Sequence, residues 1–149
     1  MYSMWLTVQE QALWRAYLMM TGRLQAAMNR QLQQDCGLSL ADYDVLVALD
    51  ESPGCRINDL GEHLGWEQSR LSHQLRRMRD RGLIDRRGAD DDRRSAIVEL
   101  TGAGREALAT AAPAHAELVR TVVFDGMNAV QLRAIDQWVA SVLSRLPQR

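Results

Sequence analysis

The chain has 149 residues, enough for one domain with a sizeable core or for one domain with an added oligomerisation element. Hydrophobic residues make up 46% of it and charged residues 25%, and no apolar run is long enough to span a membrane, so we expect no membrane partner. The two cysteines, Cys36 and Cys55, have no metal-site or disulfide spacing, and the N-terminus lacks the features of a signal peptide, which predicts a cytoplasmic location.

The formal net charge of -1 conceals one basic segment. All 18 basic residues are arginines, and nine of them lie between Arg70 and Arg94, beside only five acidic residues. A basic surface on an otherwise acidic protein is typical of proteins that bind a polyanion. From charge alone, a solvated helix face with internal ion pairs explains the segment equally well.

Two helices are predicted before this segment. Residues 5–34 should form one long helix, because large apolar side chains recur mostly in steps of four. A helix of this length exceeds what one small domain can cover, so we expect it to pack against a second copy of the chain. Ser39 then begins a second helix with Asp42 three positions later, as in a capping box, and residues 52–54 (Ser-Pro-Gly) end it.

The next segment reads as helix, turn and arginine-rich helix. A short amphipathic helix begins at Ile57, a turn follows at residues 65–67, and a second helix covers residues 68–81, with Gly82 as its C-cap. This pattern is typical of a helix-turn-helix, whose second helix enters the major groove of DNA. The residues predicted to reach base edges are Gln68, Ser69, Arg70, Ser72 and His73, and those predicted to hold phosphates are Arg76 and Arg77.

A β-hairpin is predicted after these helices. Residues 83–87 and 96–100 are rich in strand formers, and residues 88–94 (GADDDRR) form the loop between them. One aspartate of this loop can brace a neighbouring arginine, so that Arg93 or Arg94 projects into a minor groove. Arg87, at the end of the first strand, completes the predicted DNA-facing set. The alternative is a disordered acidic loop.

The C-terminal third is predicted to be helical. Thr101 can cap a helix that runs to about Phe124, although Pro113 must kink or interrupt it. Asn128 with Gln131 opens a last helix that carries a broad apolar stripe. We therefore predict a mainly α fold with a small β-hairpin wing, in which a winged helix-turn-helix lobe (residues 38–100) joins a helical dimerisation region (residues 5–36 and 101–146).

This layout resembles the MarR (multiple antibiotic resistance regulator) family of bacterial transcription factors. The matching strings are LSLADYDVLVAL, INDLGEHLG, SRLSHQLRRMRDRGLIDR and DRRSAIVELTGAGR, so the resemblance covers nearly the whole chain as a single domain, residues 1–149. It implies a homodimer that binds a pseudo-palindrome in double-stranded DNA. Asp92 and Arg94 match the family's bracing aspartate and wing-tip arginine by position. Many members are repressors released by a small ligand between the dimerisation body and the lobes.

A small-molecule effector is therefore the expected signal. The residues predicted to line its pocket are Trp14, Tyr17, Arg23 and Tyr43. Three alternatives remain open: a metal sensor built on His63, His73 and His115, a thiol switch at Cys36 or Cys55, and an architectural DNA-binding protein without a sensing role. No phosphate-binding glycine loop, HExxH motif or nucleophile elbow occurs, so we expect neither an enzyme nor a cofactor.

Overall fold

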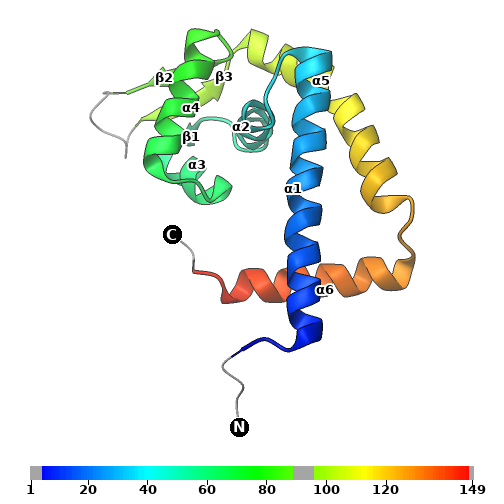
Figure 1. Ribbon diagram of the computed structural model, residues 1–149. Helices are drawn as coiled ribbons and strands as arrows, with labels where there is room; N and C mark the ends of the chain where they lie inside the picture. Colours follow the sequence, from blue (N-terminus) through cyan, green and yellow to red (C-terminus); the bar gives the residue numbers. More distant parts are fainter. Residues whose placement is uncertain (1–4, 89–95, 148–149) are drawn as a thin grey trace.

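The computed structural model describes residues 5–88 and 96–147. Its elements are α1 (Val8–Cys36), α2 (Leu40–Glu51), β1 (Cys55–Arg56), α3 (Ile57–Leu64), α4 (Gln68–Asp80), β2 (Ile84–Arg87), β3 (Ile97–Leu100), α5 (Gly102–Val119), a π-helical turn η1 (Arg120–Phe124) and α6 (Ala129–Arg145). Figure 1 shows α3, α4 and the strands grouped on one side of α2, with α1 and α5 on the other. The predicted fold class, mainly α with a winged helix-turn-helix, is confirmed.

Local capping chemistry fixes where the helices begin. α1 starts three residues later than predicted because Thr7 and Glu10 form a capping box, each side chain bonding the other's backbone N–H. Ser39 and Asp42 do the same for α2, as predicted. α1 ends at Cys36 and is capped by Gly37, whose φ of +67° is a left-handed conformation that favours glycine.

The wing is part of a three-stranded antiparallel sheet with the order β1-β3-β2. The predicted hairpin is present, with Ile84 opposite Leu100. The third strand, β1, was not predicted, and it pairs Cys55 with Val98. A strand of two residues is too short to produce an alternating sequence pattern, and only its pairing partner defines it.

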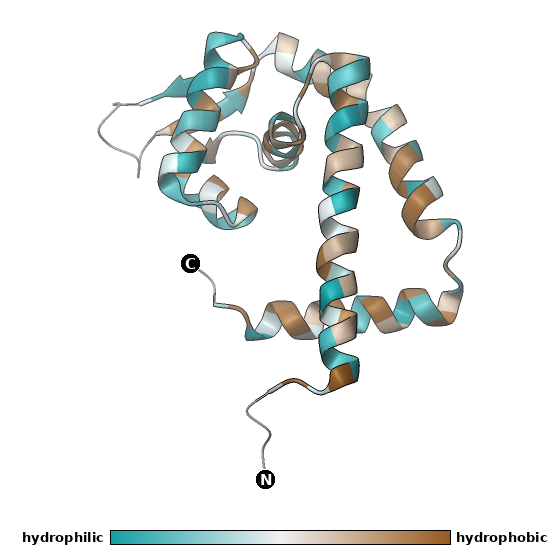
Figure 2. Ribbon diagram, viewed as in Figure 1, coloured by the Kyte–Doolittle hydropathy of each residue, from teal (hydrophilic) through white to brown (hydrophobic). Residues whose placement is uncertain are grey.

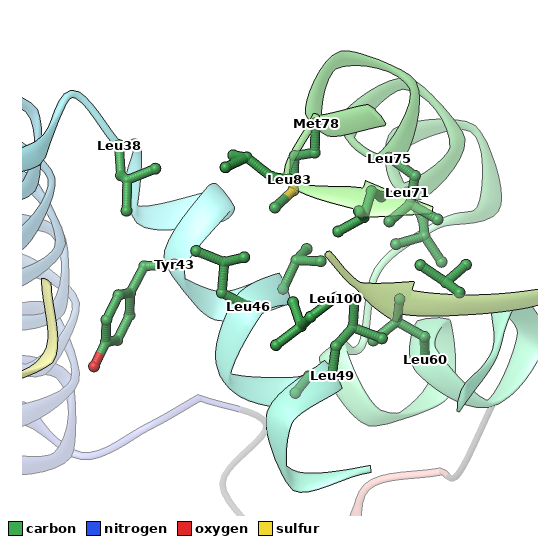
Figure 3. Close-up of a cluster of buried hydrophobic side chains, with 14 of the residues drawn as sticks. Leu38, Tyr43, Leu46, Leu49, Leu60, Leu71, Leu75, Met78, Leu83 and Leu100 are labelled. Atoms are coloured by element: carbon green, nitrogen blue, oxygen red, sulfur yellow. The ribbon is translucent and has the colours of Figure 1, made fainter. Parts of the chain in front are cut away.

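The hydrophobic core surrounds α2. Leu46 and Leu49 of α2 are buried among side chains from α4 and the sheet, and Figure 3 shows them on the side that faces Leu71 and Leu100. Tyr43 points to the opposite side of α2, toward the long helices (Figure 3). α2 therefore connects the winged helix-turn-helix lobe to the helical body through densely packed side chains.

The bend of α5 fits the kink predicted at Pro113, and the helix differs from the prediction in where its α-helical pattern ends. Pro113 lies inside it, and the helix is bent along its length, but it is not interrupted there (Figure 1). The α-helical pattern instead gives way at Arg120, where η1 begins.

α6 packs on little else in its own chain. It crosses the N-terminal half of α1, where Trp138 contacts Tyr17, and Figure 2 shows apolar residues along both helices. Trp138 is 48% exposed and Leu143 is 64% exposed. Among the described residues, no helix combines the length and apolar character needed to cross a membrane.

Candidate nucleic-acid interface

α4 presents a polar face because its apolar face is buried. Leu71, Leu75 and Met78 lie in the core at helical spacing. The predicted base-reading and phosphate-binding residues consequently lie on the outer side. Those that are exposed are Gln68, Ser69, Arg70, His73, Arg76 and Arg77, and Ser72 is half-buried.

Within the described part of the chain, no side chain caps the N-terminal end of α4. Glu67 occupies the N-cap position, but its side chain forms no capping hydrogen bond. Trp66, one residue earlier, is half-buried, and the guanidinium carbon of Arg70 lies 4.3 Å from the centroid of its ring. Sequence reasoning missed Trp66, although its position four residues before an arginine was a usable signal.

A buried carboxylate holds α4 against α2. Asp42 accepts hydrogen bonds from Gln74 Nε2 at 2.6 Å and from Arg81 Nη1 at 2.8 Å. It also accepts one from its capping partner, the backbone N–H of Ser39. Burial alone would raise the pKa of Asp42, but these hydrogen bonds and the charge of Arg81 outweigh it and lower the pKa below its ordinary value of 3.8. The angle of α4 is thus set by a charged contact as well as by apolar packing.

A basic cavity of about 300 Å³ separates α4 from the sheet. Ser72, Arg76 and Arg79 of α4 line one side of it, and Arg86 of β2 lines the other. Arg79 and Arg86 were not among the predicted residues, because only the docking of the sheet against α4 brings them together. The basic surface therefore continues from the helix to the wing.

The wing contributes one described residue of the predicted set. Arg87 forms a two-pronged ion pair with Glu99 on β3, with Nε 3.0 Å from Oε1 and Nη2 3.2 Å from Oε2. Arg87 therefore braces the two strands of the hairpin, and its charge is partly neutralised. Asp92, Arg93 and Arg94 lie outside the described residues, so their predicted roles stay predictions.

The four predicted pocket residues do not come together. Trp14 and Tyr17 stack at 5.7 Å between ring centroids, and Tyr17 meets Trp138 edge-on at 5.5 Å, beside an apolar groove of about 720 Å³ between α1 and α6. Arg23 is exposed, six residues further along α1. Tyr43 lies on α2, and its ring centroid is 4.2 Å from that of His115 on α5.

The sequence did not predict that His115 would lie beside Tyr43. Its Nδ1 atom is buried and has no hydrogen-bond partner among the described residues. Burial lowers the pKa of His115 below its ordinary value of 6.5, so the neutral ring is favoured. An open groove of about 510 Å³ lies beside it, lined also by Ala116, Val119, Arg120 and Phe124.

The metal and thiol alternatives gain no candidate site. Within residues 5–88 and 96–147, no group of three histidine, cysteine or acidic side chains is placed to hold a metal ion. Cys36 and Cys55 are unpaired and half-buried. Burial and the charge of Asp59 raise the pKa of the Cys55 thiol, which disfavours the reactive thiolate.

Known proteins are similar to this chain in both sequence and fold. The sequence model described as "MarR family" matches residues 37–95. Sco3205, a MarR family transcriptional regulator from Streptomyces coelicolor solved in complex with DNA, is 34% identical over an alignment that covers 95% of this chain and 90% of Sco3205, with a TM-score of 0.87. AbsC, a MarR family transcriptional regulator from the same organism, is also 34% identical, covering 95% of this chain and 97% of AbsC, with a TM-score of 0.86.

A more distant similarity is to the organic hydroperoxide resistance transcriptional regulator of Bacillus subtilis (strain 168). It is 29% identical over 75 residues, which are 50% of this chain. The match spans about half of that relative, 51% of its length.

Proposed function

This chain belongs to the MarR family of transcriptional regulators, a family without enzymatic activity, and we propose that it represses transcription as a homodimer bound to a pseudo-palindromic operator. The observation that carries the proposal is the outer face of α4. Arginine, glutamine, serine and histidine side chains are exposed there on a helix whose other face is fully packed. These side chains suit base edges and phosphates in a major groove. Because the proposed target is DNA, we propose that the protein acts in the cytoplasm.

The wing supplies the second contact in this proposal. β2 and β3 lead away from α4 toward the loop that carries Asp92, Arg93 and Arg94, and Arg87 and Glu99 hold the two strands together at the base of that loop. With α4 in a major groove, wing arginines are proposed to enter the flanking minor groove, and Arg76 and Arg77 to hold phosphates.

The second copy of the chain is proposed to bind α1 and α6. Large apolar residues are exposed along both helices. Single apolar residues are common on protein surfaces, whereas a group of this size is typical of an interaction surface. The exposed residues include Leu13, Trp14, Leu132, Ile135, Trp138 and Leu143. A two-fold dimer through this surface would hold two α4 helices for successive major grooves, about 34 Å apart.

We further propose that a small apolar or aromatic effector binds beside Tyr43 and His115. This pair lies where α2 of the lobe meets α5 of the body, and His115 Nδ1 has an unused hydrogen-bonding capacity there. A ligand that favours one lobe spacing over another shifts the dimer away from the spacing that fits DNA. We assign Trp14 and Tyr17 to the dimer surface instead. A role for Arg23 in the effector pocket stays a prediction.

Selection from randomised duplexes, followed by footprinting, tests the regulator against the architectural alternative. A regulator enriches a two-fold symmetric site and protects two half-sites one helical turn apart. Addition of the protein should then lower transcription from a reporter promoter that contains this site. Binding that shows no sequence preference in competition with unselected DNA would overturn the proposal and favour an architectural role.

A further inference from the structure

Arg70 differs from the other arginines of α4 in its surroundings. It lies in the first turn of the helix, the part of a recognition helix that reaches deepest into a major groove. Its guanidinium lies over the ring of Trp66, 4.3 Å from the centroid. Arg76 and Arg77 lie later in the helix, and no aromatic ring contacts either of them among the described residues.

Stacking on an aromatic ring leaves the hydrogen-bonding edge of an arginine available. The five N–H donors of a guanidinium lie in its own plane, and a ring that approaches its face occupies none of them. The fork of two parallel donors matches the O6 and N7 acceptors of guanine. An arginine held in this way has fewer conformations to lose when it binds a base.

Trp66 is itself held in place. It precedes the N-cap Glu67, and it is partly buried and packed against the hydrophobic core. Its backbone N–H donates to the carbonyl oxygen of Gly61 at 3.1 Å, which closes the turn after α3. The ring is therefore a fixed support, since both its backbone and its side chain are tied to packed residues.

A charge on the neighbouring helix acts on the same guanidinium. Burial raises the pKa of Asp44 on α2, and the positive charge of Arg70 partly offsets that rise. The carboxylate of Asp44 and the guanidinium of Arg70 therefore attract each other. The contact with the ring of Trp66 reduces the range of positions that the long side chain of Arg70 samples.

We propose that Arg70 reads a guanine in each half-site and that Trp66 is the positioning residue that holds it for this contact. The inference rests on the proposed function, since it concerns the operator that the protein selects. Trp66 touches no base in this arrangement. Its contribution is exerted through Arg70 alone.

The test compares full-length variants in a selection from randomised duplexes. Wild-type protein should enrich a guanine at one symmetric pair of positions. Arg70→Ala should lose that preference by roughly 10- to 100-fold at that position, and Arg70→Lys should lose part of it, because an ammonium can donate to O6 and N7 but lacks the planar fork of the guanidinium. Affinity for unselected DNA should change far less in Arg70→Lys, which keeps the charge that attracts phosphates.

Trp66 variants then separate positioning from folding. Trp66→Leu, which keeps an apolar side chain in the turn, should reduce the same guanine preference by roughly three- to tenfold. Trp66→Phe should restore most of it, because phenylalanine also offers a ring face. In an Arg70→Ala background, Trp66→Leu should have no further effect. Arg30→Ala, which removes an exposed arginine of α1, is the matched control for lost charge.

Two results would overturn the inference while leaving the regulator intact. One is a guanine preference that survives Arg70→Ala. The other is a Trp66→Leu substitution that lowers operator affinity equally in the wild-type and Arg70→Ala backgrounds. That result would show that the ring supports only the turn. Wild-type protein that enriches no sequence would instead overturn the proposed function, and the inference with it.

Discussion

At the scale of single residues, Asp42 stabilises more of the structure than the capping box at the start of α2. It closes the start of α2 through Ser39 and binds Gln74 and Arg81 of the α4 region. Arg81 also donates to the carbonyl oxygen of Gly37, between α1 and α2. One carboxylate therefore connects the recognition helix to the point where the helical body meets the lobe.

Asp42→Ala should lower the free energy of unfolding by about 2 kcal/mol at pH 7. The full cost of breaking a buried pair, about 3–5 kcal/mol, is reduced here because the Arg81 side chain is 46% exposed. Since the folded state lowers the pKa of Asp42, its contribution is present above the ordinary value of 3.8 and is lost as the pH falls through the lower folded value. Urea denaturation from pH 7 to pH 2.5 measures this.

The control for this experiment is Asp50→Ala, which removes an exposed acid from the same helix. It should change stability by less than about 0.5 kcal/mol. An Asp42→Ala deficit that does not shrink as the pH falls below 3.8 would contradict the assignment, because Asp42 of the unfolded wild-type chain is then increasingly protonated and the preference for the folded carboxylate is lost.

At the scale of elements, the start of α5 is fitted closely to the end of α4. The Thr101 hydroxyl donates to the carbonyl oxygen of Gly82 at 2.7 Å and accepts from the N–H of Gly104 at 3.0 Å. Thr101 N–H donates to the carbonyl oxygen of Leu83. A Cβ atom on Gly104 would overlap that same carbonyl oxygen. The sequence Leu-Thr-x-x-Gly thus fixes α5 of the helical body to the lobe through backbone contacts.

Gly104→Ala should destabilise the protein by more than about 2 kcal/mol, because the obstructing atom is backbone and cannot rotate away. Gly102→Ala is the matched control, since a Cβ there meets nothing within 4 Å, and it should be neutral or stabilising by up to about 1 kcal/mol. Thermal and urea unfolding of both variants measure the difference. Equal stability of the two variants would contradict the close packing of α5.

The wing can be tested at the same scale. Arg94→Ala should weaken binding to the selected operator by about 1–3 kcal/mol, mainly at the minor-groove positions, if this arginine is the wing tip. Fluorescence anisotropy at fixed salt measures the loss, with Arg30→Ala as the control for charge. An unchanged affinity would show that the wing does not make the proposed contact.

At the scale of the whole molecule, the exposed apolar residues of α1 and α6 determine the proposed assembly. The apolar stripe of α6 has little of its own chain to pack against beyond the contact of Trp138 with Tyr17. A surface of this kind is stabilised when a partner covers it. The two lobes of a dimer would then be positioned by helices that contact no DNA.

Trp138→Glu should shift the protein from dimer to monomer, because a charge would be buried in the proposed interface. Gln137→Glu adds the same charge on the polar face of α6 and should leave the dimer intact. Sedimentation at micromolar concentration distinguishes the two states, and removal of all residues after Asn128 should also give a monomer. A folded dimer from the truncated chain would show that the interface lies elsewhere.

Much of the architecture was determined by the sequence itself. The helices, their capping residues, the hairpin and the outward face of α4 follow from periodicity and from signals within a few residues. Such features depend on neighbours along the chain, which is why most of their boundaries were predicted to within about three residues, although α5 ends at Val119 and not at about Phe124. The same information places Arg70 on the reading face, although it cannot distinguish Arg70 from the arginines that follow.

Only the tertiary structure decided which distant groups meet. Asp42 binds Arg81 across 39 positions, Tyr43 packs on His115, and Arg86 joins Arg79 at one cavity. It also separated the predicted pocket residues, because Trp14 and Tyr17 lie near α6 whereas Tyr43 faces α5. These outcomes depend on how whole elements dock, and docking is set by the shape and burial of many side chains together. No local pattern in the sequence contains that information.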